Sequence, residues 1–181
     1  EIVACLVGSE MCIRDSYDYN VVRWSSEPDG NLLGIGPSVS NPLTGEIISA
    51  DVVNKLLAIK LGYNYRKLYG YTEDNDPLMQ YITNLTLHEV GHVLGLRHNF
   101  RGSYLYSPDE IHDKNITGNV LMSSVMDYDP INIAPEGVEQ GIYFSTEPGV
   151  YDKWAVKFGY TPNLTDAVSY THLRAHETSD Y

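Results

Sequence analysis

Two histidines four residues apart, followed by a glycine and a third histidine, constrain this chain more than any other feature of its sequence. A helix carrying His88 and His92 presents both rings on one face. If that helix continued, His98 would lie about 9 Å farther along the axis, too far to share a metal ion with them. Gly95 can adopt the left-handed backbone conformation without steric penalty and so turn the chain back. The spacing therefore predicts three imidazoles around one metal ion and a helix that ends near Gly95.

A glutamate directly after the first histidine completes the pattern HExxHxxGxxH. A catalytic zinc ion takes about four ligands and keeps one position for water. Glu89 points slightly away from the ligand face, so its carboxylate can reach that water without binding the metal. It can take a proton as the water attacks a peptide carbonyl and return it to the leaving amine. The motif predicts His88, His92 and His98 as ligands of one zinc ion and Glu89 as the general base of peptide hydrolysis.

Length and composition are those of one folded domain with an acidic surface. The chain has 181 residues, of which 43% are hydrophobic and 20% charged, and its net charge is −12. Nucleic acids and anionic membranes are bound through basic patches, so this charge argues against both as partners. No run approaches the roughly 18 apolar residues that a membrane span needs. We therefore expect a protein or peptide substrate as the partner, and the oligomeric state stays open.

Two segments near the ends of the chain resemble translations of opposite strands of one sequencing-library adapter. They are residues 6–16 (LVGSEMCIRDS) and 168–178 (VSYTHLRAHET). Segments of this kind are excluded from fold reasoning. We expect residues 1–16 and 168–181 to be adapter-derived and residues 17–167 to be a partial catalytic domain.

This division removes several residues that could be taken for functional ones. His172, His176 and Glu177 could pass for a second metal cluster, but they receive no role. Cys12 lies in the first segment, so the cysteine content predicts neither disulfides nor a redox compartment. His112 is the one histidine of residues 17–167 outside the motif, and its polar surroundings (DEIHDK) predict a solvated side chain rather than a ligand.

Residues 20–50 read as three strands. Residues 20–25 (NVVRWS) are rich in β-branched and aromatic side chains, and residues 32–39 and 46–50 are further extended runs. The turn-forming sequence at 41–45 (NPLTG) predicts a hairpin between the second and third strands. Either of these two strands could present a free edge along which a peptide adds as a further strand.

Two helices are predicted before the third histidine. Asp51 can cap a helix over residues 52–68, where apolar residues fall near helical spacing. Asp76 is a suitable N-cap for a second helix, and Pro77 suits its first position. This second helix carries His88 and His92.

The second half of the chain shows few regular elements. Residues 101–119 are polar and rich in turn formers, which indicates a surface loop. After Met126, residues 150–158 (VYDKWAVKF) predict a helix with Trp154 on its buried side.

The run HEVGHVLGLRH resembles the zinc-binding consensus of the metzincin clan of metallopeptidases. That clan has a Met-turn, a tight turn whose methionine underlies the histidine ligands. Residues 124–128 (SVMDY) fit it, so the resemblance makes Met126 the Met-turn methionine, with an ordinary core methionine as the alternative. In astacin-like and serralysin-like members, a tyrosine two residues later can bind zinc and stabilise the oxyanion. Tyr128 holds that position, and a merely packed phenol is the alternative.

The wider set NVVRW, NPLTGEI, HEVGHVLGLRHNF, SVMDY and YDKWAVKFGY resembles a bacterial family of large exported zinc-dependent metallopeptidases over residues 19–160. The resemblance implies an α+β catalytic domain with a twisted mixed sheet, an active-site helix and a substrate-binding edge strand. It also implies export to the periplasm, the cell surface or the medium. Such proteins carry long regions on both sides, so we expect this chain to be a fragment. The alternatives are a zinc-stabilised binding module without catalysis and a fragment that does not fold.

Overall fold

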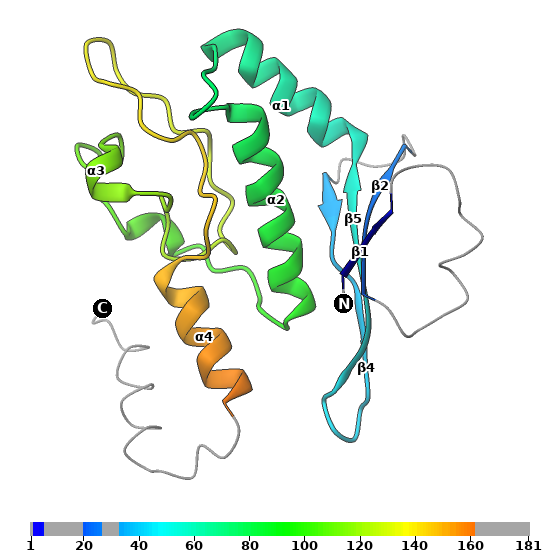
Figure 1. The fold of residues 1–181 in the computed structure, drawn as a ribbon. Helices are drawn as coiled ribbons and strands as arrows, with labels where there is room; N and C mark the ends of the chain where they lie inside the picture. The colour runs from blue at the N-terminus through cyan, green and yellow to red at the C-terminus, as the bar shows by residue number, and fades with distance from the viewer. Residues whose placement is uncertain (1, 6–19, 27–32, 162–181) are drawn as a thin grey trace, which may run out of the picture.

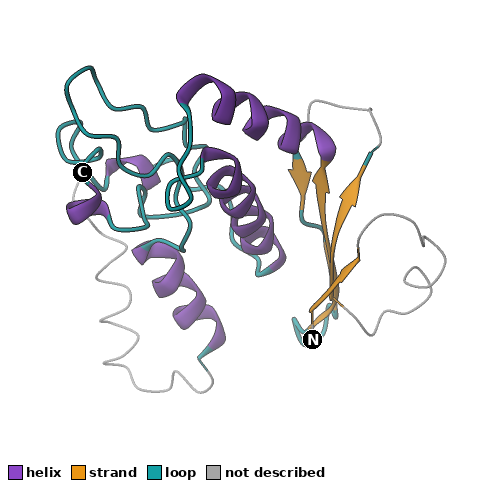
Figure 2. Ribbon diagram, turned by 45° about the horizontal axis from the view of Figure 1, so that its top comes forward, coloured by secondary structure: helices purple, strands orange, loops and turns teal. Residues whose placement is uncertain are grey.

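The computed structural model describes residues 2–5, 20–26 and 33–161. Helix α2 (Pro77–Val93) lies between a mixed β-sheet and a long, mostly irregular segment (Figure 1, Figure 2). Helix α1 (Leu56–Tyr69) packs on α2. The described part of the chain ends in α4 (Val150–Tyr160). This arrangement confirms the α+β fold class.

Within the described residues the sheet has the strand order β1-β2-β5-β3, and β4 also pairs with β5. The strands are β1 (Ile2–Cys5), β2 (Asn20–Ser25), β3 (Gly34–Ile35), β4 (Ser38–Ser40) and β5 (Ile47–Lys55). β1, β2 and β5 are parallel, whereas β3 and β4 run antiparallel to β5. β1 lies within residues 1–16, whose assignment to adapter sequence stays a prediction.

The strand predicted over residues 32–39 is present as the two short strands β3 and β4, which together form one edge of the sheet. They are separated at Gly36 and Pro37, and proline has no backbone N–H to donate to a ladder. The predicted hairpin is confirmed: the Gly45 N–H donates to the Asn41 carbonyl at 2.8 Å, and Gly45 has φ +76°. Of the two candidate edge strands, the first lies at the edge as β3 and β4. The second falls on residues 47–50 of β5, which pair with β4, whereas β2 pairs with residues 51–55 of β5.

The predicted start of the first helix is wrong. β5 continues to Lys55, and α1 begins only at Leu56. Val52 and Val53 are buried, and β-branched side chains favour a strand at such positions. Asp51 caps no helix. Its carboxylate accepts three hydrogen bonds from the Arg23 guanidinium of the neighbouring strand, at 2.8, 3.2 and 2.7 Å. A cross-strand ion pair takes the place of the expected cap.

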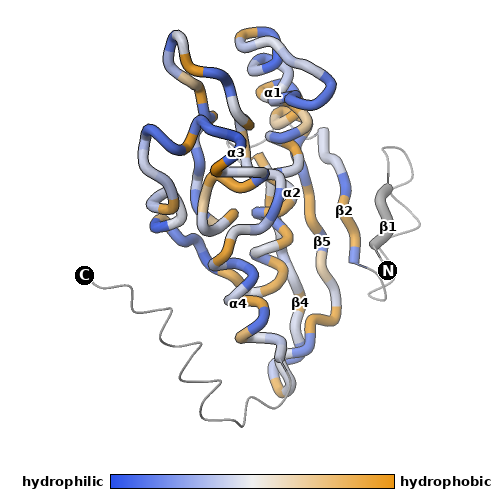
Figure 3. The backbone as a smooth tube through the Cα atoms, turned by 60° about the vertical axis from the view of Figure 1, so that its left-hand side comes forward, coloured by the Kyte–Doolittle hydropathy of each residue, from blue (hydrophilic) through white to orange (hydrophobic). Residues whose placement is uncertain are grey.

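Helix α2 has the predicted ends. The Asp76 carboxylate accepts from the Leu78 N–H at 3.0 Å, and Pro77 occupies the first turn. The last helical residue is Val93, and Gly95 follows with φ +86°. Hydrophobic stretches run along both α2 and β5 (Figure 3), and Asn54 on β5 donates to the Thr86 hydroxyl on α2 at 3.0 Å. The helix is thus fixed against the sheet over the half that carries the histidines.

Polar side chains of α2 hold the irregular segment on its other side. The Gln80 side-chain oxygen accepts from the N–H groups of Tyr143 and Phe144, at 2.7 and 3.2 Å. The Asn84 amide donates to the Ser145 carbonyl at 3.2 Å. A buried segment without regular structure needs such partners for its backbone groups. The two helix amides therefore take the place of a neighbouring strand.

The predicted loop and final helix are both present. Residues 101–119 contain only the short helices η1 (Gly102–Tyr104) and α3 (Lys114–Thr117). The helix expected over 150–158 is α4, on which Trp154 is half-buried. Among the described residues, no helix combines the length and the apolar character needed to cross a lipid bilayer.

Two glycines allow the edge of the sheet to lie directly on α2. A Cβ atom at Gly36 would lie 2.2 Å from the Glu89 carbonyl oxygen, and one at Gly34 would lie 2.7 Å from Glu89 Oε1. Real Cβ atoms do not approach other atoms so closely. Both positions therefore need glycine for space rather than for its backbone freedom.

We expect Gly36→Ala to lower the free energy of unfolding by roughly 1–3 kcal/mol, because the added methyl group meets backbone atoms that cannot turn aside. Gly159→Ala is the matched control, since a Cβ at this α4 position has nothing within 4 Å. The control should be as stable as the wild type or slightly more stable. Urea denaturation of the three proteins measures this, and an unchanged Gly36→Ala protein would contradict the close approach.

Asp129 is a carboxylate held in the layer between α2 and the irregular segment, 3.4 Å from the Asn84 amide nitrogen. Burial raises the pKa of Asp129 to about 7, and the neighbouring charge of Asp127 acts in the same direction. The unfolded chain loses this proton near pH 4, whereas the folded chain keeps it up to about pH 7. Because the folded state binds more protons in that window, this group makes the protein less stable as the pH rises through it.

Asp129→Asn should remove that pH dependence, because the amide stays neutral throughout. Relative to the wild type, the variant should gain about 2–4 kcal/mol in unfolding free energy on going from about pH 4 to about pH 8. Denaturant titrations at both pH values measure the gain. The exposed Asp113, changed to Asn, serves as control. A stability difference that stays constant with pH would rule out the buried acid as its source.

Candidate metal centre

The three motif histidines converge, although they come from two different segments. His88 and His92 lie one turn apart on α2, and His98 follows the end of the helix. A nitrogen from each ring lies within 4.8 Å of the others, and His92 Nε2 and His98 Nε2 are 3.1 Å apart. His88 is buried, His92 half-buried and His98 exposed. The cluster therefore opens to solvent on the side of His98.

The turn at Gly95 brings His98 back, as the spacing predicts. The Leu96 N–H donates to the Gly91 carbonyl, and the Gly95 N–H to the His92 carbonyl, each at 3.0 Å. A Cβ at Gly95 would have nothing within 4 Å, so its positive φ alone requires glycine there. The chain reverses within a few residues of the second ligand.

Hydrogen bonds select the nitrogen atoms that face the centre of the cluster. His88 Nδ1 lies 2.7 Å from the Val125 carbonyl oxygen, and His92 Nδ1 lies 3.1 Å from that of Leu96. Because a carbonyl oxygen can only accept, each Nδ1 carries the hydrogen and each neutral ring presents an Nε2 lone pair. Tetrahedral zinc places its nitrogen ligands about 3.3 Å apart. The donor atoms and their spacing therefore fit a metal ion.

Burial also favours the neutral rings that a metal needs. It lowers the pKa values of both His88 and His98, and for each the neighbouring histidines act in the same direction. Metal ligation requires the unprotonated nitrogen. The rings of His88 and His98 therefore stay unprotonated, the form that binds a metal ion, down to a lower pH than the ring of free histidine does.

Glu89 is buried between α2 and the sheet edge and is not a member of the metal-ligand cluster. Its exposed fraction is 5%, and its carboxylate lies over Gly34 of β3. Burial raises the pKa of Glu89, against the opposing effect of His92. The side chain therefore turns away from bulk solvent, on the sheet side of α2.

Met126 lies beneath the cluster. It is fully buried, and its sulfur leaves no room for a side chain at Gly91, where a Cβ would lie 2.3 Å away. The Met126 carbonyl accepts from the Asn99 N–H at 3.0 Å, and the adjacent Val125 carbonyl accepts from His88. The turn around Met126 is thus bonded to the ligand helix and to the residue that follows the third ligand.

Tyr128 joins the histidines from the same turn. Its hydroxyl lies 2.8 Å from His98 Nε2, and its ring stacks on that of His88 with the centroids 5.4 Å apart. The side chain is 64% exposed, so the phenol is not simply packed in the core. It lines the open side of the cluster.

Three residues near the site were not identified from the sequence. Phe100 is 62% exposed, with its ring 5.8 Å from that of His98. Gly91 makes room for Met126, and a glycine inside a helix is a weak signal of such close packing. Asp152 is buried and bonded to the turn before Met126. An acidic residue in the first turn of a helix is common, so its position gives no sequence signal of this contact.

His112 lies outside the cluster. It is half-buried rather than fully solvated, and its buried Nδ1 atom has no hydrogen-bond partner within the part of the chain that the structure describes. Among the described residues, the histidines of the motif form the group that could hold a metal ion.

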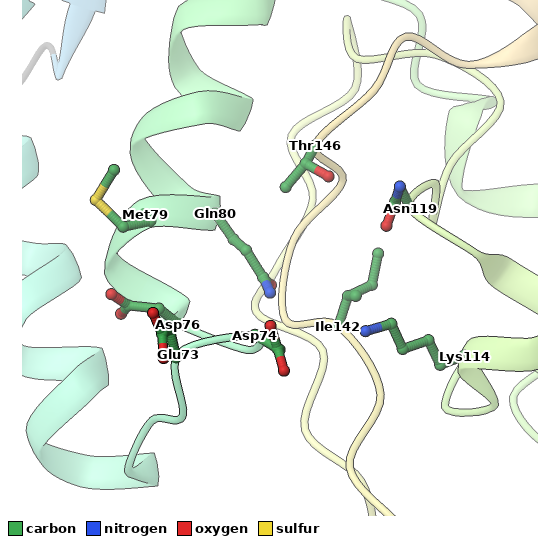
Figure 4. Close-up of a pocket in the computed structure, with 9 residues that line it drawn as sticks. All are labelled: Glu73, Asp74, Asp76, Met79, Gln80, Lys114, Asn119, Ile142 and Thr146. Atoms are coloured by element: carbon green, nitrogen blue, oxygen red, sulfur yellow. The ribbon is translucent and has the colours of Figure 1, made fainter.

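A hollow with mixed charges lies at the other end of α2 (Figure 4). It is lined by Glu73, Asp74, Asp76, Met79, Gln80, Lys114, Asn119, Ile142 and Thr146. Gln80 precedes His88 by eight residues, about 12 Å along a helix. The hollow is therefore separate from the metal cluster.

The family model described as Met-zincin matches residues 71–174, more than half of the chain. Comparisons with curated proteins and with solved structures give no match. The matched region reaches past residue 168, and the boundary expected there stays a prediction. The matched region includes α2, the turn that carries Met126, and α4. The chain belongs to the Met-zincin family.

Proposed function

We propose that this chain is the catalytic part of a zinc-dependent endopeptidase. The observation that carries the proposal is the convergence of His88, His92 and His98, with the buried Glu89 carboxylate beside them but outside the ligand set. A zinc ion held by three imidazoles lowers the pKa of water to near 7 and polarises a carbonyl group. Peptide hydrolysis needs both effects together with a proton carrier.

Glu89 is the proton carrier in this proposal. Its carboxylate takes a proton from the attacking water and later donates it to the nitrogen of the leaving amine. Burial raises the pKa of Glu89, which makes the carboxylate a better proton acceptor than a solvated one. Its location against β3 limits the positions that the side chain can adopt.

Tyr128 stabilises the charge that develops on the scissile carbonyl oxygen. The phenol hydroxyl donates hydrogen bonds, lies 2.8 Å from His98 Nε2 and is exposed to an incoming substrate. A donor placed where negative charge appears lowers the barrier more than it strengthens substrate binding.

The substrate is a protein or peptide in extended form that lies along the β3–β4 edge. All three residues of β4 are exposed, and this edge is antiparallel to β5 and close to Glu89 through Gly34 and Gly36. A peptide can add there as a further strand through backbone hydrogen bonds. The close approach of Gly34 and Gly36 to Glu89 favours this edge over residues 47–50 of β5, which pair with β4. Export of the protein stays an expectation from the family resemblance.

Glu89→Gln should lower kcat/KM for cleavage of denatured protein by at least about 100-fold, because the amide cannot accept the proton. Zinc content, measured by atomic absorption, should stay at that of the wild type, since Glu89 is not a ligand. Glu110→Gln, at an exposed glutamate, is the matched control and should cleave normally. Equal cleavage by both variants would remove Glu89 as the base. A zinc-loaded wild type that cleaves nothing would favour the binding-module alternative.

Tyr128→Phe should lower kcat roughly 10- to 100-fold with little change in KM, because the lost hydroxyl acts in the transition state. Tyr104→Phe is the control, since this tyrosine is 82% exposed and belongs to the loop helix η1. Steady-state kinetics with a quenched fluorescent peptide separate the two constants. A change confined to KM would assign Tyr128 to substrate binding.

A further inference from the structure

A buried carboxylate on α4 is connected to the first metal ligand by a continuous series of hydrogen bonds. Asp152 is 3% exposed and accepts from the Ser124 hydroxyl at 2.6 Å. It also accepts from the N–H groups of Val125 and Gly149, at 2.8 and 2.9 Å. Neither the histidine motif nor the turn sequence contains this residue.

The series runs through one peptide group. The His88 Nδ1–H donates to the Val125 carbonyl at 2.7 Å. The N–H of the same peptide group belongs to Met126 and donates to the Ser124 hydroxyl oxygen at 3.1 Å. The Ser124 hydroxyl then donates to Asp152 Oδ1. Every donor therefore points toward the carboxylate.

A one-directional series of this kind polarises each of its members. Ser124, Val125 and Met126 are 1%, 7% and 0% exposed, so water does not compete with these bonds. A carboxylate that accepts directly from a ligating histidine fixes its tautomer and makes its other nitrogen a stronger ligand. Here a serine and a peptide group stand between the carboxylate and the ring. The bond from His92 to Leu96 lies outside the series.

We propose that Asp152 is a positioning residue that acts through Ser124 and the Val125–Met126 peptide to orient His88 and strengthen its Nε2 as a metal ligand. The inference rests on the metal site of the proposed function. It goes beyond that function by assigning part of the metal affinity to a residue on α4. A purely structural Asp152 would anchor the turn without affecting the ligand.

Ser124→Ala tests the inference, because it interrupts the series while leaving Asp152 bonded to Val125 and Gly149. Ser145→Ala is the matched control. Ser145 is 2% exposed, and its hydroxyl accepts from the buried Leu121 N–H at 2.9 Å. Each variant thus loses one buried serine acceptor, but only Ser124 is connected to His88. Because Ser124 also donates to the buried Asp152 carboxylate, the metal-free form of Ser124→Ala should lose more stability than that of Ser145→Ala.

Zinc affinity of the 181-residue chain, measured by competition with a chromophoric chelator, should fall roughly 10- to 100-fold in Ser124→Ala. In Ser145→Ala it should stay within about twofold of the wild type. A Ser124→Ala protein that binds zinc as tightly as the control would overturn the proposal. This measurement needs no peptidase activity, so failure of the proposed catalysis would be recognised separately.

A second measurement uses the wild type alone and does not depend on whether the variant folds. In nitrogen-15 NMR of the zinc-loaded protein, His88 should carry its hydrogen on Nδ1 and bind the metal through Nε2. A downfield Nδ1 proton that exchanges slowly with water is the expected signature. Metal bound at Nδ1, or an Nδ1 proton that exchanges at the rate of free imidazole, would overturn the proposal.

Discussion

The contact between Gly91 and Met126 sets the distance between the ligand helix and the turn beneath it. A side chain at position 91 would overlap the Met126 sulfur, so the helix and the turn approach as closely as backbone and thioether permit. At this separation the Val125 carbonyl reaches His88, and the Met126 carbonyl reaches the N–H of Asn99. One turn therefore positions both His88 and the residue that follows His98, although these residues lie in different segments.

The features that could be predicted from the sequence are those with local causes. The ring spacing on α2, its Asp76 cap and the reversal at Gly95 all depend on neighbouring residues, and each is present in the structure. Asp51 shows where local reasoning fails. Its carboxylate could cap a helix or pair with a residue on a neighbouring strand, and the nearby sequence does not show that Arg23 lies within reach. The choice of edge strand likewise depends on pairing, which one sequence does not specify.

Side chains that act across the fold could not be found from pattern. Asp152 follows Ser124 by 28 residues and reaches the site only because α4 packs behind the turn. Phe100 is an exposed aromatic residue two positions after His98, and no sequence pattern shows that the two rings lie 5.8 Å apart. The amides Gln80 and Asn84 read as ordinary helix residues, yet they satisfy the backbone of a segment about 60 residues later. The roles of Asp152, Gln80 and Asn84 depend on long-range contacts.

The bond between Asn99 and the turn would also link binding of the proposed zinc ion to folding of the second half of the chain. The residue after His98 donates its N–H to the Met126 carbonyl, and this bond forms only when residues 124–128 dock on α2. An ion that binds the complete ligand set more tightly than two histidines must then favour the docked state by the same free energy. In the proposed zinc-bound form, the ion and the irregular half of the molecule would form one cooperative unit, and a chelator would act as a denaturant.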